Sequence, residues 1–210
     1  ELQEQLAASF PATAVPIHPG HLAVQVARFF APDAIVCLDG GNTGIWAHLA
    51  HRIRRPRSFL WTGHFGHLGT GLPYAIAAKL ACPERPVYLF TGDSALGFNL
   101  QELETAVRER LDLTVVVNCD WAWGMERLGQ QLEMGQVIGV DTAPIRYDEI
   151  VRAMGGHGEL VERPEQIAAA LERAATFPGP AVVQVVVDRE ANASPPGLAE
   201  FAQMYAAVDG

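Results

Sequence analysis

The chain has 210 residues, 49% of them hydrophobic, which suits one domain with a real core. Its formal net charge of −9 argues against a protein that binds nucleic acid, and no stretch is long and apolar enough to span a membrane. The three cysteines match neither a zinc site nor a disulfide framework, so we expect a cytoplasmic protein.

Strands and helices are predicted to alternate along the chain. Short apolar runs predict strands at residues 34–38, 87–90, 113–117, 159–161 and 181–187. Longer amphipathic segments predict helices at residues 45–51, 69–81, 100–110, 148–154 and 164–176. This alternation predicts an α/β fold, a doubly wound and mostly parallel sheet with helices on both faces. We expect one domain over residues 1–190 and a C-terminal tail over 191–210, with a short helix near 198–207.

Polar and glycine-rich loops follow three of the predicted strands, after Leu38, Phe90 and Val117. Ligands in parallel α/β sheets bind beyond the carboxyl ends of the strands. The three loops are therefore expected to share one edge of the sheet and to form the binding site there.

The loop Gly92-Asp93-Ser94 suggests a site for a metal and a phosphate. Gly92 permits a tight backbone, and the N–H groups of Ser94 and Ala95 are expected to be free to face an anion. A carboxylate beside those amides would repel a bare phosphate, and a divalent cation between them removes the conflict. Considered alone, Asp93 is equally compatible with a turn-forming or helix-capping role.

A second carboxylate, Asp120, strengthens the metal hypothesis. It lies 27 positions after Asp93, with one helix and one strand predicted between them, so both loops reach the same edge. Mg²⁺ prefers hard oxygen ligands together with substrate phosphates. The third loop, residues 40–43, adds amides and small polar side chains. It lacks a full dinucleotide fingerprint and a Walker lysine, which argues against NAD and ATP.

These motifs resemble thiamine diphosphate enzymes of the acetolactate synthase, benzoylformate decarboxylase and 2-hydroxyacyl-CoA lyase superfamily. The resemblance covers residues 16–188 and concerns the C-terminal domain that binds the cofactor diphosphate. The family motif is Gly-Asp-Gly followed, after a spacer, by Asn-Asn. In this chain Ser94 replaces the last glycine, and the later segment is Asn118-Cys119-Asp120. Counting back from Trp123-Gly124-Met125 places Asp120 at the metal position, whereas a rival register would make Asn118 the ligand.

The resemblance also implies roles for individual residues. It implies that Mg²⁺ is bound by the side chains of Asp93 and Asp120 and by the carbonyl of Ala122. It implies that the Gly66 carbonyl accepts from the cofactor's 4′-amino group and that Leu68 is the wedge that bends the cofactor. The other implied cofactor contacts are Gly41, Asn42, Thr43, His67, Gly92, Ser94, Ala95 and Met125. His64 and His67 either face the reacting groups or are ordinary loop residues.

The implied function is that of one part of a 2-oxo acid decarboxylase or carboligase similar to acetolactate synthase. In this family a glutamate on a pyrimidine-binding domain activates the cofactor. We expect that domain from the same polypeptide or from another subunit of a homo- or hetero-oligomer, and we expect this chain alone to bind weakly and not to turn over. The alternatives are a 2-hydroxyacyl-CoA lyase or oxalyl-CoA decarboxylase-like enzyme, or a noncatalytic domain of the same fold.

Overall fold

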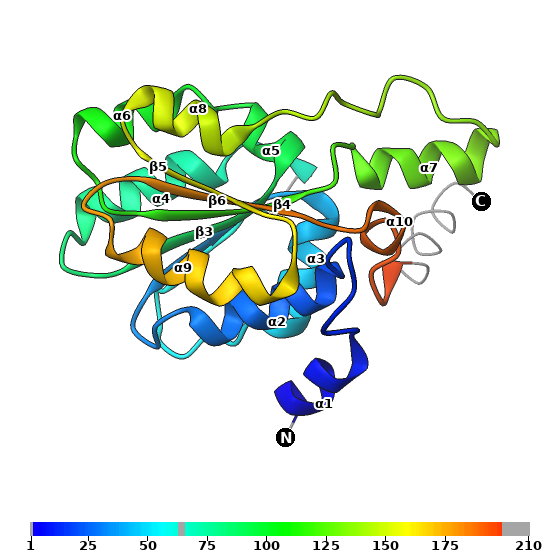
Figure 1. Ribbon diagram of the computed structural model, residues 1–210, viewed down its shortest axis with the longest axis horizontal. Coiled ribbons are helices and arrows are strands. Elements are labelled where there is room, and N and C mark those ends of the chain that lie inside the picture. Colours follow the sequence, from blue (N-terminus) through cyan, green and yellow to red (C-terminus); the bar gives the residue numbers. More distant parts are fainter. Residues whose placement is uncertain (1, 63–65, 199–210) are drawn as a thin grey trace.

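The computed structural model describes residues 2–62 and 66–198. Its six strands form one sheet in the order β2-β1-β3-β4-β6-β5, and all neighbouring strands are parallel. The strands are β1 (Ile35–Leu38), β2 (Phe59–Leu60), β3 (Val87–Gly92), β4 (Thr114–Cys119), β5 (His157–Val161) and β6 (Ala181–Val186). The predicted doubly wound α/β fold is therefore confirmed (Figure 1).

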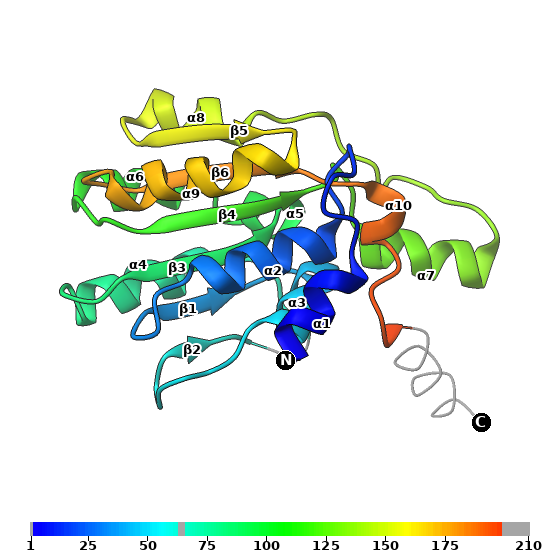
Figure 2. The same ribbon diagram turned by 60° about the horizontal axis from the view of Figure 1, so that its bottom comes forward.

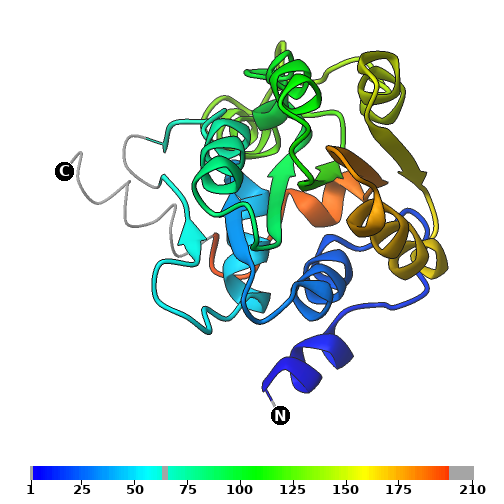
Figure 3. The ribbon, with the colours of Figure 1, turned by 90° about the vertical axis from the view of Figure 1, so that its left-hand side faces the viewer.

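Helices cover both faces of this sheet, as Figures 2 and 3 show. One face carries α2 (Pro19–Phe29), α3 (Gly41–Ala50) and α9 (Ile167–Thr176), and the other carries α4 (Gly71–Ala81), α6 (Glu102–Arg108) and α8 (Tyr147–Met154). The remaining helices are α1 (Leu2–Ser9), α5 (Asp93–Gly97), α7 (Gly124–Met134) and α10 (Arg189–Asn192). None of the helices in the described residues has the length and hydropathy needed to cross a membrane.

The core consists of two apolar layers, one on each face of the sheet. Along β4, Val116 packs into one layer, and its neighbours Val115 and Val117 pack into the other. This alternation follows from the period of two residues in a strand. All residues of β4 are buried, which explains the continuous apolar run in its sequence.

Several predicted boundaries are wrong in ways that affect the site. Helix α3 begins at Gly41 rather than at residue 45, because Gly40 adopts φ 101° and turns the chain directly into the helix. β4 extends through Cys119, so Asn118 belongs to the strand. The helix predicted at 164–176 is a 3₁₀ turn at Pro164–Gln166 followed by α9. The helix predicted near 198–207 lies almost entirely outside the described residues.

The strand order creates a place for a ligand between β1 and β3. After β1 the chain moves outward to the edge strand β2 and then returns across β1 to form β3. The loops that leave β1 and β3 therefore diverge to opposite faces of the sheet. A crevice at the carboxyl ends of two such strands is the usual ligand position in open α/β sheets.

Candidate functional site

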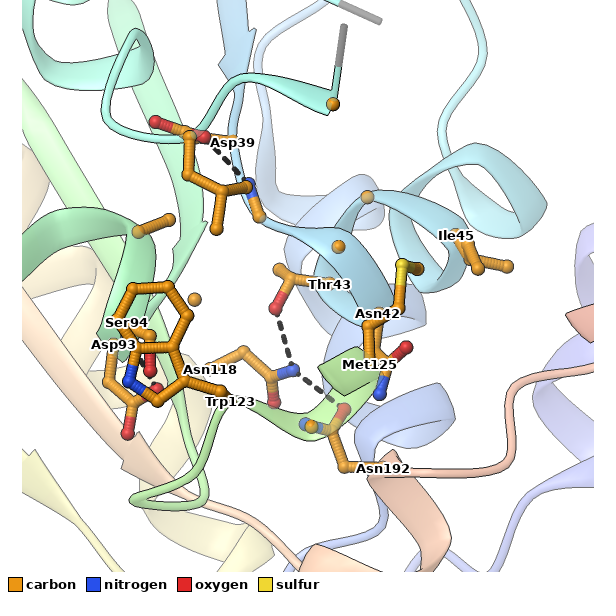
Figure 4. A pocket seen from close by; sticks show the side chains of 18 of the residues that line it. Asp39, Asn42, Thr43, Ile45, Asp93, Ser94, Asn118, Trp123, Met125 and Asn192 are labelled. Carbon is orange, nitrogen blue, oxygen red and sulfur yellow. Dashed lines mark hydrogen bonds between the residues drawn. The ribbon is translucent and has the colours of Figure 1, made fainter. Parts of the chain in front are cut away.

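A pocket of about 480 Å³ lies at the carboxyl ends of β1, β3 and β4. Its walls come from the start of α3, the loop before α4, the start of α5, the loop after β4, the start of α7 and α10 (Figure 4). The pocket is lined by all the predicted site residues: Gly41, Asn42, Thr43, Gly66, His67, Leu68, Gly92, Asp93, Ser94, Ala95, Asp120, Ala122 and Met125. The structure thus brings them together, and their roles toward a cofactor stay predictions.

Asp93 is the first residue of α5, and its carboxylate is buried and held in place by hydrogen bonds. Oδ1 accepts from the Ser94 N–H at 2.7 Å, and Oδ2 accepts from the Trp121 N–H at 2.7 Å and the Cys119 thiol at 3.4 Å. The expectation that the Ser94 N–H is free to face an anion is therefore wrong. The carboxylate of the preceding residue takes the hydrogen bond of that amide.

Asp120 follows β4 and is equally buried. Its Oδ1 accepts from the Ala122 N–H at 3.1 Å, and its Oδ2 accepts from Asn192 Nδ2 at 2.7 Å. The Ala122 carbonyl accepts from Ser94 Oγ at 3.1 Å, which ties the loop after β4 to the start of α5. Each of these oxygens has a second lone pair, so the hydrogen bonds orient potential metal ligands without using them up.

The two buried carboxylates favour the binding of a cation between them. Burial raises the pKa of Asp93 to about 6, and the negative charge of Asp120 adds to this effect. Burial also raises the pKa of Asp120, against the opposing effect of the hydrogen bond from Asn192. Two buried negative charges in one wall are unfavourable until a positive charge lies between them.

The first turn of α3 supplies the complementary wall. Gly41, Asn42 and Thr43 lie in this turn, whose N–H groups have no acceptor within the helix. The positive end of the helix dipole adds to their attraction for an anion. A Cβ at Gly41 would lie 3.2 Å from Met125 Cε, so a glycine lets α7 pack tightly against this turn. This wall fits a phosphate group.

Buried polar atoms without partners point to a polar ligand. Within the described residues, Asn42 Nδ2, Asn42 Oδ1 and Asn118 Oδ1 are buried and make no hydrogen bond. A Cβ at Gly124 would lie 2.8 Å from Asn42 Nδ2 and 3.4 Å from Asp120 Oδ2, so glycine keeps this space free. Buried amide groups are costly to leave unpaired. Their arrangement beside two carboxylates and a helix N-terminus fits a metal ion with a diphosphate.

Part of the pocket wall is apolar. Ile45, Leu68, Trp123 and Met125 line it, and Leu68 is half-buried, as a side chain in contact with an aromatic ligand would be. His67 also lines the pocket and is exposed, whereas His64 lies outside the described residues.

The sequence did not indicate the contacts that two site residues, Asn118 and Asn192, make in the structure. Asn118 donates from Nδ2 to Thr43 Oγ1 at 3.0 Å and to Asn192 Oδ1 at 2.9 Å (Figure 4). Asn192 lies in the expected tail, yet it is buried in the pocket wall. It is the last residue of α10, beyond the carboxyl end of β6, where no sequence motif marks it.

A metal at this site would need oxygen ligands besides the two carboxylates. Within the residues that the structure describes, no group of three or more His, Cys, Asp or Glu is placed to hold a metal. A site with two carboxylates therefore depends on a backbone carbonyl, water or ligand oxygens, which matches the way proteins bind Mg²⁺ with phosphates.

Known proteins share this sequence pattern. Residues 39–185 match the family model described as "Thiamine pyrophosphate enzyme, C-terminal TPP binding domain", where thiamine pyrophosphate is thiamine diphosphate. The chain is 41% identical over 175 residues to the acetolactate synthase large subunit IlvG of Mycobacterium tuberculosis, covering 83% of this chain and 32% of that protein. It is 35% identical over 169 residues to a 2-hydroxyacyl-CoA lyase of Arabidopsis thaliana, covering 77% and 29%.

A solved structure shares the fold. The benzoylformate decarboxylase of Polynucleobacter necessarius superposes with a TM-score of 0.76 at 22% identity, covering 84% of this chain and 34% of that one. The chain spans about a third of the length of the curated relatives it matches. From the matched model, the fold and the pocket at the expected strand ends, the chain belongs to the thiamine pyrophosphate enzymes and contains their C-terminal cofactor-binding domain.

Proposed function

We propose that this domain binds thiamine diphosphate through Mg²⁺, as one part of an enzyme that decarboxylates or ligates 2-oxo acids. The main support is the pair of buried carboxylates, Asp93 and Asp120, in the same pocket as the free N–H groups of α3. A cation satisfies the carboxylates, and its diphosphate satisfies the amides. Without the cation the buried carboxylates would have no opposite charge beside them, and without the diphosphate the N–H groups of α3 would have no acceptor.

Mg²⁺ would be bound by the carboxylates of Asp93 and Asp120 and by the Ala122 carbonyl. The free lone pairs left by the hydrogen bonds to these oxygens support this assignment. The rival ligand, Asn118, donates from Nδ2 to two neighbours, and its unpaired Oδ1, an acceptor, suits a cation or a water and not the diphosphate oxygens. Asp120 also adds a negative charge beside the cation, which an asparagine does not.

The diphosphate would lie against Gly41, Asn42 and Thr43 in the first turn of α3, with Gly92, Ser94 and Ala95 on the opposite side. The support is the set of unpaired amide atoms of Asn42 and the Thr43 hydroxyl, which accepts from Asn118 and keeps its own proton for a ligand. The aromatic part of the cofactor would contact Gly66, His67, Leu68 and Met125, which also line the pocket.

When bound, thiamine diphosphate supplies the nucleophilic carbon and the electron sink that 2-oxo acid chemistry needs. This chain's residues would position the cofactor and compensate its charge. The activating glutamate would come from a pyrimidine-binding domain of the same polypeptide or of another subunit, in a homo- or hetero-oligomer. We therefore expect this chain alone to bind weakly and to show no turnover. The three cysteines are free, in keeping with a cytoplasmic enzyme.

A 2-hydroxyacyl-CoA lyase is the second candidate function. Its support is the 35% identity to the Arabidopsis thaliana protein of that name, against 41% identity to the acetolactate synthase subunit. A noncatalytic domain of the same fold is disfavoured by the buried carboxylate pair, because such a domain has no use for two destabilising charges in a pocket.

Titration calorimetry with thiamine diphosphate tests the proposal. The 210-residue chain should bind the cofactor in the presence of Mg²⁺ and lose binding when the metal is chelated. Asp93→Ala should abolish the signal, and Asp33→Ala should not, because Asp33 is an exposed acidic residue at the opposite ends of the strands. Equal binding with and without metal, or binding by Asp93→Ala at wild-type strength, would contradict the proposal.

A further inference from the structure

We propose that α10 is a clamp on the metal-binding loop and that Asn192 is the positioning residue through which it orients the Asp120 carboxylate. This inference rests on the proposed function and adds a residue that the matched family region, which ends at residue 185, does not include. The clamp consists of α10 itself, Arg189–Asn192, and its contacts with the loop after β4.

The position of α10 is fixed by the residue before it. The Asp188 N–H donates to the Ile17 carbonyl at 2.9 Å, and the Asp188 side chain caps the helix by accepting from the Ala191 N–H at 2.9 Å. Figures 1 and 2 both place α10 beside the start of α7, directly after the loop that contains Asp120. A short element can act as a clamp only when it is itself anchored, and these two bonds provide the anchor.

The clamp donates hydrogen bonds to the backbone of the loop and to the side chain of Asp120. Arg189 donates from Nε to the Asp120 carbonyl at 2.9 Å and from one terminal nitrogen to the Trp121 carbonyl at 3.1 Å. Asn192 donates from Nδ2 to Asp120 Oδ2 at 2.7 Å. Trp121 adopts φ 54°, in the left-handed region that is unfavourable for a side chain of this size. External hydrogen bonds are what hold such a backbone in place.

The amide of Asn192 has only one suitable orientation. Its Oδ1 accepts from Asn118 Nδ2 at 2.9 Å, while the same Asn118 nitrogen donates to Thr43 Oγ1 at 3.0 Å. Turning the Asn192 amide over would place its oxygen against the Asp120 carboxylate and its NH₂ against the NH₂ of Asn118. Both contacts would be repulsive, so Nδ2 faces the Asp120 carboxylate, which only accepts, and Oδ1 faces Asn118, the contact marked in Figure 4.

A neutral donor suits this position. Asn192 is buried, and its hydrogen bond occupies one lone pair of Asp120 Oδ2. The direction of the second lone pair of that oxygen is thereby fixed. A lysine or arginine at this position would orient the carboxylate but would also cancel the charge that the cation needs. The amide orients the ligand and leaves its charge intact. The same chain of bonds connects the metal loop, through Asn118, with Thr43 in the diphosphate wall.

The inference is tested by metal-dependent binding of thiamine diphosphate to variants of the 210-residue chain, measured by calorimetry. Loss of a hydrogen-bond partner of a metal ligand weakens metal binding by about 10-fold to 100-fold. Asn192→Ala should lower the Mg²⁺-supported affinity by this factor. It should lower the Ca²⁺-supported affinity less, because Ca²⁺ tolerates irregular ligand geometry and Mg²⁺ does not. A purely structural defect would lower both affinities equally.

Two further variants complete the design. Asn192→Leu has a side chain of similar size, so it removes the hydrogen bond without creating a cavity, and it should reproduce the preferential loss with Mg²⁺. Glu190→Ala changes a side chain of α10 that is 79% exposed and should bind as the wild type does. Thermal melting of the metal-free variants identifies folded proteins, and the Leu variant carries the test if the Ala variant does not fold.

The outcomes distinguish a failure of the proposed function from a failure of the clamp. Failure of the wild-type chain to bind with Mg²⁺ overturns the proposed function. Wild-type binding together with undiminished binding by the Asn192 variants, or an equal loss with Mg²⁺ and Ca²⁺, overturns the clamp alone.

Discussion

Lowering the pH from 7 to 5 should weaken Mg²⁺-dependent cofactor binding through Asp93. Burial, with the added charge of Asp120, raises the pKa of this carboxyl to about 6 in the metal-free chain. Mg²⁺ binds the carboxylate and not the acid, so its affinity follows the ionised fraction. That fraction falls from about nine-tenths at pH 7 to about one-tenth at pH 5, so the affinity should fall about tenfold.

The matched control is Asp120→Asn. The charge of Asp120 is one cause of the raised pKa of Asp93, so its removal should shift the midpoint of the pH dependence to lower pH. The cofactor's own diphosphate titrates identically in both proteins, and the difference between them reports on the pair of carboxylates. Calorimetry at several pH values between 5 and 8 measures both curves. An affinity that does not decline below pH 6, or curves with the same midpoint, would refute the reasoning.

The same pKa shift has a consequence for the stability of the metal-free chain. A carboxyl with a raised folded-state pKa contributes stability that is complete below its unfolded pKa of about 4 and is lost as the pH rises through 6. The shift corresponds to roughly 3 kcal/mol. Saturating Mg²⁺ and thiamine diphosphate should therefore raise the melting temperature more at pH 7 than at pH 5, as scanning calorimetry can measure.

Three further substitutions test the pocket and the core. Gly124→Ala should weaken cofactor binding about tenfold, because its Cβ would lie 2.8 Å from a buried amide nitrogen, whereas Gly129→Ala on the same helix has nothing within 4 Å and should bind normally. Leu68→Ala should weaken binding by about tenfold in the same calorimetric assay, and the exposed Leu80→Ala should not. Leu171→Ala, on the buried face of α9, should lower the free energy of unfolding by about 2–5 kcal/mol in denaturant titrations and leave the affinity unchanged.

The sheet and its binding edge could be predicted because their causes are local. Short β-branched runs such as Val115–Val117 are typical of a strand buried on both faces, and polar or glycine-rich loops after such runs mark its carboxyl end. Parallel pairing then places Asp93 and Asp120 at the same edge, whatever the details of the helices between them. This is why the predicted pocket residues do converge in the structure.

The start of α3 could not be predicted from the same signals. Gly41, Asn42 and Thr43 are poor helix formers and are typical of turns. In the structure Gly40 turns the chain and the helix begins at once, because burial of Trp46 and Ala47 against the sheet outweighs the weak local preference. The consequence for function is considerable, since these residues become a helix N-terminus rather than a loop.

Asn192 was beyond prediction for a different reason. Its segment contains no motif, and only the three-dimensional fold shows that the end of β6 lies beside the end of β4. The hydrogen bonds to Asp120 and Asn118 join residues more than 70 positions apart. Asn118 and Asp120, the two alternatives for the metal position in the sequence, meet opposite ends of the Asn192 amide: Asn118 donates to Oδ1, and Asp120 accepts from Nδ2.

The most direct test is the position of a bound metal. A crystal of the chain with thiamine diphosphate and Mn²⁺, which shares the preference of Mg²⁺ for oxygen ligands, locates the ion by its anomalous scattering. We predict one peak in contact with the carboxylates of Asp93 and Asp120 and the Ala122 carbonyl. A peak on Asn118 Oδ1 without Asp120, or none beside Asp93, would contradict the account.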